Sequence, residues 1–141
     1  MRRRIVAGNW KLHGDRQFAF ALLDVISDVA APVGVERIVL PPLPYLGELV
    51  ERYGGKGLEF GAQDVSSNEK GAYTGEISAA MLIDVGARYG LVGHSERRQY
   101  HRESSELVAR KFLAAKAAGL TPILCIRNPQ RARGRPDRMA P

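Results

Sequence analysis

Several features that mark special classes of protein are scarce or missing in this chain of 141 residues. The single cysteine, Cys125, excludes an internal disulfide and is typical of a reducing compartment. No apolar run approaches the ~20 residues that a membrane-spanning helix needs. The basic start, Met1 to Arg4, is followed by too few apolar residues before Lys11 for a cleavable signal peptide. We therefore expect a cytoplasmic protein without a membrane partner.

The net charge of +6 is concentrated at the C-terminal end. Five arginines and one aspartate give residues 127–141 a charge of +4, whereas the other 126 residues carry 16 bases and 14 acids. The segment 127–141 has three prolines and no apolar periodicity, so we expect a basic, disordered tail. Its richness in Arg, Pro, Ala and Gly suggests out-of-frame readthrough of GC-rich DNA. Nucleic-acid binding is the weaker alternative, because the tail has no aromatic residues for base stacking.

The remaining residues, 1–126, alternate short apolar runs with amphipathic stretches and are predicted to form one unit. We expect strands at 5–10, 37–40, 58–63, 89–93 and 121–126, and helices at 15–30, 44–53, 78–86 and 104–118. In the first helix, one apolar face is predicted from Phe18, Leu22, Val25, Ile26 and Val29.

Alternating strands and helices predict an α/β fold with a parallel sheet. The strand starts are separated by 32, 21, 31 and 32 residues. An open doubly wound sheet of five strands would be complete at this length. A closed (β/α)₈ TIM barrel needs about 250 residues, so this chain would hold only about its first five strands. Periodicity alone favours the open sheet.

Three short segments favour the barrel instead. They are Ala-Gly-Asn-Trp-Lys at 7–11, Gly-Ala-Tyr-Thr-Gly-Glu at 71–76 and Gly-His-Ser-Glu-Arg-Arg at 93–98. In this order and spacing, residues 4–126 closely resemble the N-terminal part of the triosephosphate isomerase family. The resemblance implies a truncated TIM barrel, a homodimer, and neither a metal nor an organic cofactor. It also implies interconversion of dihydroxyacetone phosphate and glyceraldehyde 3-phosphate through an enediolate, in glycolysis and gluconeogenesis.

Candidate catalytic residues follow the first and fourth expected strands, where active sites of parallel α/β proteins form. By spacing alone, Lys11 would be a surface lysine, Asn9 either a turn cap or a substrate donor, and a lone histidine a core residue. The resemblance implies that His94 is a neutral electrophile that polarises the substrate carbonyl, as the matching histidine does in that family. It further implies that Lys11 acts electrostatically and that Asn9 and Lys11 bind substrate.

Further residues have supporting roles by the same resemblance. Glu96 matches an acidic residue close to the lysine, and we interpret it as the partner of Lys11, with proton relay as the weaker alternative. Thr74 resembles a residue that crosses the dimer interface, and the alternative interpretation is a solvated loop threonine. Cys125 is expected to be a packed thiol, and His13 and His101 are interpreted as surface or capping residues. Arg97 and Arg98 are expected to form structural ion pairs and hydrogen bonds around the loops.

The resemblance also indicates which parts of the reaction have no match in this chain. The family's general-base glutamate follows its sixth strand, a lid covers the site, and glycine-rich phosphate loops follow the seventh and eighth strands. We therefore expect the chain to be inactive alone. It could persist by recruiting a complementary C-terminal fragment, by oligomerising, or only as a poorly stable product. Two alternatives stay open: a binding module that docks onto intact isomerase subunits, and an open-sheet phosphate or RNA binder that uses the basic tail.

Overall fold

The computed structural model describes residues 2–126, and the predicted tail at 127–141 lies outside the described residues. The strands are β1 (Arg4–Asn9), β2 (Val35–Leu40), β3 (Glu59–Ala62), β4 (Tyr89–Val92) and β5 (Thr121–Leu124). The helices are α1 (Arg16–Asp28), α2 (Leu43–Tyr53), α3 (Ala79–Asp84), α4 (Ser95–Tyr100) and α5 (Ser105–Ala118). Each expected strand and helix is present, with ends that differ by up to two residues.

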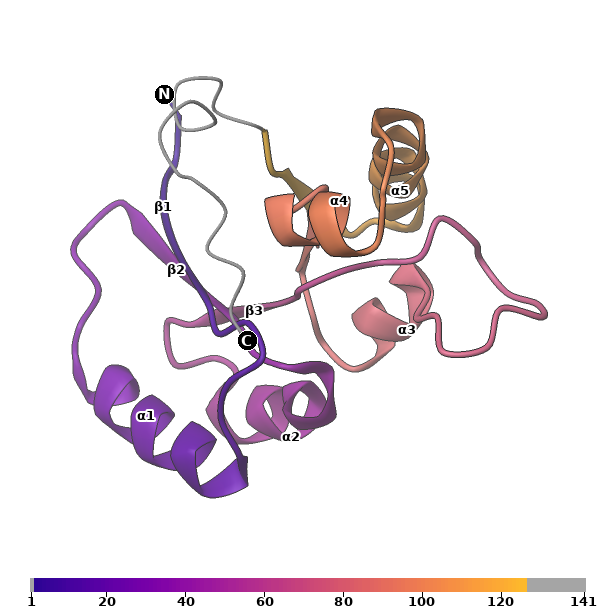
Figure 1. Cartoon of the computed structure of the whole chain (residues 1–141). Helices are drawn as coiled ribbons and strands as arrows, with labels where there is room; N and C mark the ends of the chain where they lie inside the picture. The colour runs from indigo at the N-terminus through magenta and orange to yellow at the C-terminus, as the bar shows by residue number, and fades with distance from the viewer. Residues whose placement is uncertain (1, 127–141) are drawn as a thin grey trace, which may run out of the picture.

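The five strands form a parallel sheet in the order β1-β2-β3-β4-β5 and curl into a half-barrel (Figure 1). A doubly wound sheet reverses its strand order at a switch point, whereas a TIM barrel adds each strand beside the one before it. The sequential order therefore decides against the open doubly wound sheet that periodicity favoured. It confirms the truncated barrel that the motifs indicated.

Local capping explains where the longer helices begin and end. The N-terminus of α1 is capped by Asp15, whose Oδ1 accepts a hydrogen bond from the Phe18 N–H at 2.8 Å. The N-terminus of α5 is capped by Ser104, whose Oγ accepts from the Leu107 N–H at 3.1 Å, and the helix ends at Gly119. In α2, Pro42 stands at the N-cap, where a missing N–H costs nothing.

The apolar face predicted for α1 is confirmed only in part, because Ile26 packs against the core while most of the other predicted residues do not. Phe18 is 47% and Val25 65% exposed, and the buried residues of this helix are Ala19 and Leu23. The reason is tertiary: α1 packs against α2 near the edge of the sheet, so only the side that faces α2 is covered. Tyr53 of α2 fixes this pairing, because its hydroxyl donates to Asp24 Oδ1 of α1 at 2.5 Å and lies 3.1 Å from the Phe20 carbonyl oxygen of the same helix.

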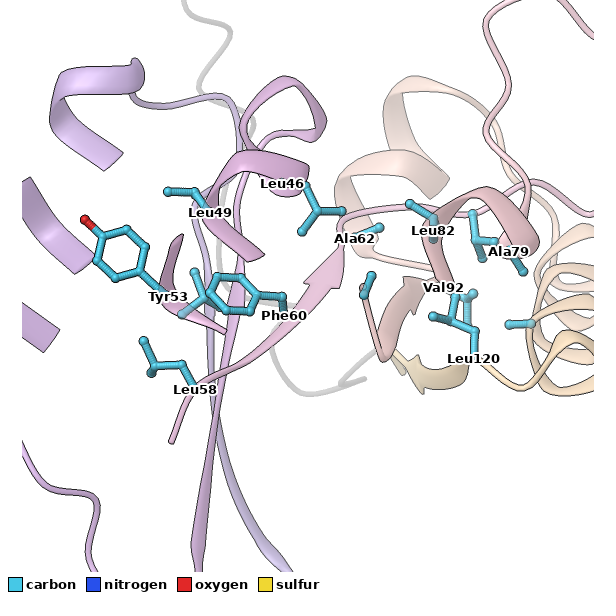
Figure 2. Packing of buried hydrophobic residues seen from close by; sticks show 14 of the residues in the cluster. Leu46, Leu49, Tyr53, Leu58, Phe60, Ala62, Ala79, Leu82, Val92 and Leu120 are labelled. Atoms are coloured by element: carbon cyan, nitrogen blue, oxygen red, sulfur yellow. The ribbon is translucent and has the colours of Figure 1, made fainter. Parts of the chain in front are cut away.

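The main core lies between the sheet and the helices (Figure 2). Leu46 and Leu49 of α2 lie near Phe60 of β3, and Leu82 of α3 lies near Val92 of β4. A smaller buried cluster on the other face of the sheet holds Ile38, Leu40, Tyr89 and Leu91. Both faces of the central strands are therefore covered, as expected for a parallel sheet. Because the strands are parallel, their carboxyl ends lie together at one end of the half-barrel.

The two edge strands are less well covered. All six residues of β1 are exposed or half-buried, with Val6 64% exposed, and Leu124 of β5 is also exposed. In the described part of the chain, each of these strands has a sheet neighbour on one side only. Apolar side chains thus remain open at both edges of the half-barrel. No helix within residues 2–126 is long and apolar enough to cross a membrane.

Candidate active site

The residues after β1, β3 and β4 line one cavity of about 620 Å³ at the carboxyl ends of the strands. Its lining residues are Asn9, Lys11, Leu12, His13, Gln63, Asp64, His94, Glu96, Arg97, Tyr100 and His101. The structure therefore brings together four of the sequence-predicted site residues, although His94 and Glu96 are more than 80 positions from Asn9 and Lys11. The fifth, Thr74, does not line this cavity.

A tight turn after β1 places Lys11. Its backbone adopts a φ of +56°, which is uncommon for a residue with a side chain. The Lys11 N–H donates to Asn9 Oδ1 at 2.9 Å, and Gln63 Nε2 donates to the Lys11 carbonyl oxygen at 3.0 Å. Asn9 therefore stabilises the turn with its side-chain oxygen, and the residue also lines the cavity with an amide group that carries two N–H donors. The two roles considered for Asn9 are compatible.

Lys11 and Glu96 form an ion pair across the cavity, with Nζ and Oε1 2.6 Å apart. The hydrogen bond from Lys11 lowers the pKa of Glu96 below its usual value of 4.5, although partial burial opposes this shift. The side chains of Lys11 and Glu96 are 50% and 43% exposed. The pair therefore orients the ammonium group in a site that water and ligands still reach.

His94 caps the N-terminus of α4 with its own side chain. Its Nδ1 accepts a hydrogen bond from the Glu96 N–H at 3.2 Å, while Glu96 Oε2 lies 3.6 Å from the same nitrogen. Nδ1 cannot accept from the amide and donate to the carboxylate at once, and the shorter contact favours the accepting form. The proton of the neutral ring then resides on Nε2, which makes Nε2 a donor.

Gly93 before this histidine has a φ of +73°. A Cβ atom there would lie 2.7 Å from Val108 Cγ1, so both conformation and close packing require glycine. The structure shows that the neighbour it accommodates is α5.

Two other predicted residues lie outside the cavity. Thr74 is exposed in the segment 64–76, which is closed at its base by a hydrogen bond from the Ser66 N–H to the Ile77 carbonyl oxygen. Its predicted contact with a partner stays a prediction. Cys125 is half-buried beside the smaller cluster of Ile38, Leu40, Tyr89 and Leu91, and burial raises the pKa of its thiol. This environment is that of a packed cysteine with little thiolate.

Three cavity residues, Gln63, Asp64 and Tyr100, were not predicted from the sequence, and His13 and His101 were predicted to be surface or capping residues. His13 and His101 are exposed, as expected, but they also line the cavity. Gln63 and Asp64 could have been found from the sequence, because they follow the carboxyl end of β3 and Asn9 stands at the carboxyl end of β1. Among residues 2–126, no group of three or more His, Cys, Asp or Glu side chains is arranged to hold a metal ion.

The family model described as triosephosphate isomerase matches residues 4–139. The chain belongs to the triosephosphate isomerase family. It is 73% identical over 126 residues to the triosephosphate isomerase of Stenotrophomonas maltophilia, which covers 89% of this chain and 50% of that relative. The triosephosphate isomerases of Xanthomonas oryzae pv. oryzae and Xanthomonas axonopodis pv. citri are 68% and 69% identical, with the same coverage.

The chain thus spans about half the length of these triosephosphate isomerases. Family membership confirms the resemblance seen in the three sequence segments, and it agrees with the five-stranded half-barrel. The individual roles of His94, Lys11, Asn9, Glu96 and Thr74 stay predictions that the site geometry now makes specific.

Proposed function

We propose that this chain supplies the N-terminal half of the active site of a triosephosphate isomerase. The reaction would interconvert dihydroxyacetone phosphate and glyceraldehyde 3-phosphate in the cytoplasm, in glycolysis and gluconeogenesis. The observation that carries this proposal is the placement of Asn9, Lys11 and His94 around one cavity. Family membership supplies the reaction class, and the cavity supplies three donors that suit an anionic, oxygen-rich substrate.

In the proposed reaction, a proton moves between adjacent carbon atoms while the substrate passes through an enediolate. His94 donates a hydrogen bond from Nε2 to the substrate oxygen on which negative charge develops. Lys11 places its ammonium group against the phosphate and the enediolate, and Asn9 donates from its amide nitrogen. Such donors lower the barrier because they are already oriented before the charge appears. Glu96 holds Lys11 in this position.

The rest of the active site would come from C-terminal residues of the family that have no counterpart in this chain. The family's general base and phosphate-binding loops follow its sixth, seventh and eighth strands. Loss of general-base assistance alone lowers rates by about 10²–10⁴. We therefore propose that the 141-residue chain has no appreciable activity alone, and that a complementary C-terminal half restores it. The open edges at β1 and β5, with exposed Val6 and Leu124, are where added strands would pair.

We further propose that the completed barrel forms a homodimer and that Thr74 contacts the partner subunit there. Thr74 is exposed at the end of the segment 64–76, which stands away from the half-barrel as the loop before α3 (Figure 1). This exposure suits a side chain that meets another subunit.

The direct experiment is complementation. The purified chain is mixed with the C-terminal half of the Stenotrophomonas maltophilia enzyme, and isomerisation of glyceraldehyde 3-phosphate is followed in a coupled assay. We expect no turnover above background for either half alone and clear turnover for the mixture. A His94→Gln chain purified in parallel gives the background from host isomerase.

Two outcomes would contradict the proposal. Turnover by the isolated chain well above that of His94→Gln would show that the family's general base and phosphate-binding loops are not needed for activity. A stable complex of the two halves without any turnover would show that these residues do not form a working half-site. Size-exclusion chromatography of the same mixtures separates this second outcome from a failure to assemble.

A further inference from the structure

Four charged side chains form a closed ring that joins α4 to α5. Arg97 of α4 contacts two carboxylates: its Nη2 lies 3.1 Å from Asp64 Oδ2, and its Nε lies 3.1 Å from Glu103 Oε2. Lys111 of α5 contacts the same two residues, with Nζ 2.9 Å from Asp64 Oδ1 and also paired with Glu103 Oε1. Each carboxylate therefore bridges both cations, and the ring has no net charge.

The ring is buried at one end and open to the cavity at the other. The side chains of Lys111 and Glu103 are only 4% and 3% exposed, whereas Asp64 and Arg97 line the cavity. Buried charges are costly unless each is paired, and an apolar set of similar volume is often at least as stable. The proposed reaction uses neither Lys111 nor Glu103, so their burial needs another explanation.

The ring holds the short helix α4 in place. None of its residues is buried, so it has no apolar face that would fix it against the sheet. Its side-chain anchors in the described residues are polar. They are the ring contacts of Arg97, the Lys11–Glu96 pair, and two hydrogen bonds from Arg98, to the Gly93 carbonyl oxygen at 2.8 Å and to Ser105 Oγ at 3.3 Å. The chain after α4 turns through Arg102, which has an uncommon φ of +53°. This turn brings Glu103 back to Arg97.

The position of α4 sets two groups of the candidate site. His94 is the N-cap of this helix, and Glu96, which binds Lys11, lies in its first turn. We propose that the charge ring of Asp64, Arg97, Glu103 and Lys111 is a positioning device. It fixes α4, and through α4 it orients the His94 imidazole and the Lys11–Glu96 pair. The catalytic meaning of this orientation rests on the proposed function, whereas the orientation itself is a property of this chain.

A ring of this kind suits positioning better than apolar packing does. Apolar burial is non-directional, so a short amphipathic helix tolerates small rotations. A guanidinium group that contacts two carboxylates is held in both distance and plane. Because Arg97 follows Glu96 directly, a rotation that broke the ring would also move Glu96 away from Lys11.

The test measures geometry in the full 141-residue chain by NMR. The wild-type chain should show two well-separated ring-nitrogen shifts for His94, as expected for a neutral ring with Nδ1 accepting, and a protected Glu96 amide. In Arg97→Met, we expect loss of this shift separation. The Glu96 amide should exchange about tenfold faster or more, because the variant removes the charged hydrogen bonds of Arg97 that hold α4. Amides of the core helix α2 should keep their wild-type exchange rates.

Two further variants sharpen the comparison. Arg88→Met breaks an exposed arginine–glutamate pair, in which Arg88 Nη1 lies 3.4 Å from Glu59 Oε1, and should leave the His94 shifts and Glu96 exchange unchanged. Arg97→Lys keeps the charge but has one nitrogen in place of the two that contact Asp64 and Glu103, so its Glu96 exchange should fall between those of wild type and Arg97→Met.

The proposal is overturned if Arg97→Met retains the wild-type His94 shifts and Glu96 exchange, or if the wild-type chain shows averaged histidine shifts. If Arg97→Met unfolds the chain, Glu103→Gln and Arg97→Lys provide the test. Unfolding of all three variants would make the ring a global stability element and would overturn a positioning role. Failure of the proposed function is distinguishable, because the complementation assay would lack turnover whatever the NMR result.

Discussion

Lys11 and Glu96 are 85 positions apart in the sequence, yet Lys11 Nζ and Glu96 Oε1 lie 2.6 Å apart. The lysine comes from the turn after β1 and the glutamate from the first turn of α4. This ion pair links the first and third of the sequence segments that indicated the family. A long side chain that would otherwise sample many rotamers is thereby held in the cavity.

Glu96→Gln should release Lys11 with little loss of stability. Both side chains are about half exposed, and such pairs contribute only about 0–1 kcal/mol to the free energy of unfolding. Chemical denaturation should therefore change slightly, while NMR should show that the Lys11 side chain becomes mobile. Glu48→Gln, which breaks the exposed pair with Arg16, is the matched control. A Lys11 side chain equally ordered in Glu96→Gln and in wild type would contradict this role of Glu96.

The same pair predicts a pH dependence. The hydrogen bond from Lys11 lowers the pKa of Glu96 in the folded chain, so the interaction stabilises the fold at neutral pH. That stabilisation is lost as the pH falls through the lowered pKa, below the usual value of 4.5. Carboxyl ¹³C titration should give a midpoint below 4.5 for Glu96. Lys11→Met should move the midpoint upward and Arg16→Met should not; equal midpoints in both variants would refute the assignment.

Gly61 of β3 should not tolerate a side chain. A Cβ atom there would lie 2.5 Å from Leu40 Cδ2 and 2.8 Å from the Tyr89 carbonyl oxygen. We expect Gly61→Ala to lower the free energy of unfolding by about 1–3 kcal/mol, the usual cost of overpacking. Gly8→Ala in β1 is the matched control, because no atom lies within 4 Å of its added Cβ. Equal denaturation midpoints for the two variants would show that Leu40 and Tyr89 do not pack as closely on Gly61 as the structure indicates.

The stability of the main core, between the sheet and the helices, should depend on the packing of α2. Leu46 is fully buried in this helix, and Leu46→Ala should cost about 2–5 kcal/mol in unfolding free energy. The same substitution at Leu113 of α5, which is 64% exposed, should change the free energy by less than about 0.5 kcal/mol. Urea denaturation followed by circular dichroism measures both. A small effect at Leu46 would mean that α2 does not pack on the sheet as described.

Much of the fold could be predicted because local patterns and strand order agree. The apolar runs near 5, 37, 58, 89 and 121 all became strands, and the family segments identified the barrel that periodicity alone did not. The buried face of α1 could not be predicted in the same way. Its apolar residues surround much of the helix, and only the contact with α2 determines that Ala19 and Leu23 are covered.

The candidate site was predictable where its residues lie in the family segments, as Asn9, Lys11 and His94 do. The ion pairs of Arg97 were predicted, because this residue lies in the third family segment. The rest of the charge ring was not predictable, because Asp64, Glu103 and Lys111 are far apart in the sequence and carry no motif. A lysine in a helix is ordinarily solvated, and only the tertiary structure shows that Lys111 is buried between two carboxylates. Charged residues without a local pattern therefore need coordinates before a role can be assigned.

The most direct test of the account is the rate of isomerisation by the complemented complex with and without the His94 imidazole. Wild-type and His94→Gln chains are each assembled with the same C-terminal half, and equal assembly is verified by size-exclusion chromatography. The account predicts that His94→Gln lowers the rate by about 10²–10³, the usual effect of removing one oriented donor from a developing oxyanion. An equally assembled His94→Gln complex that turns over at the wild-type rate would contradict it.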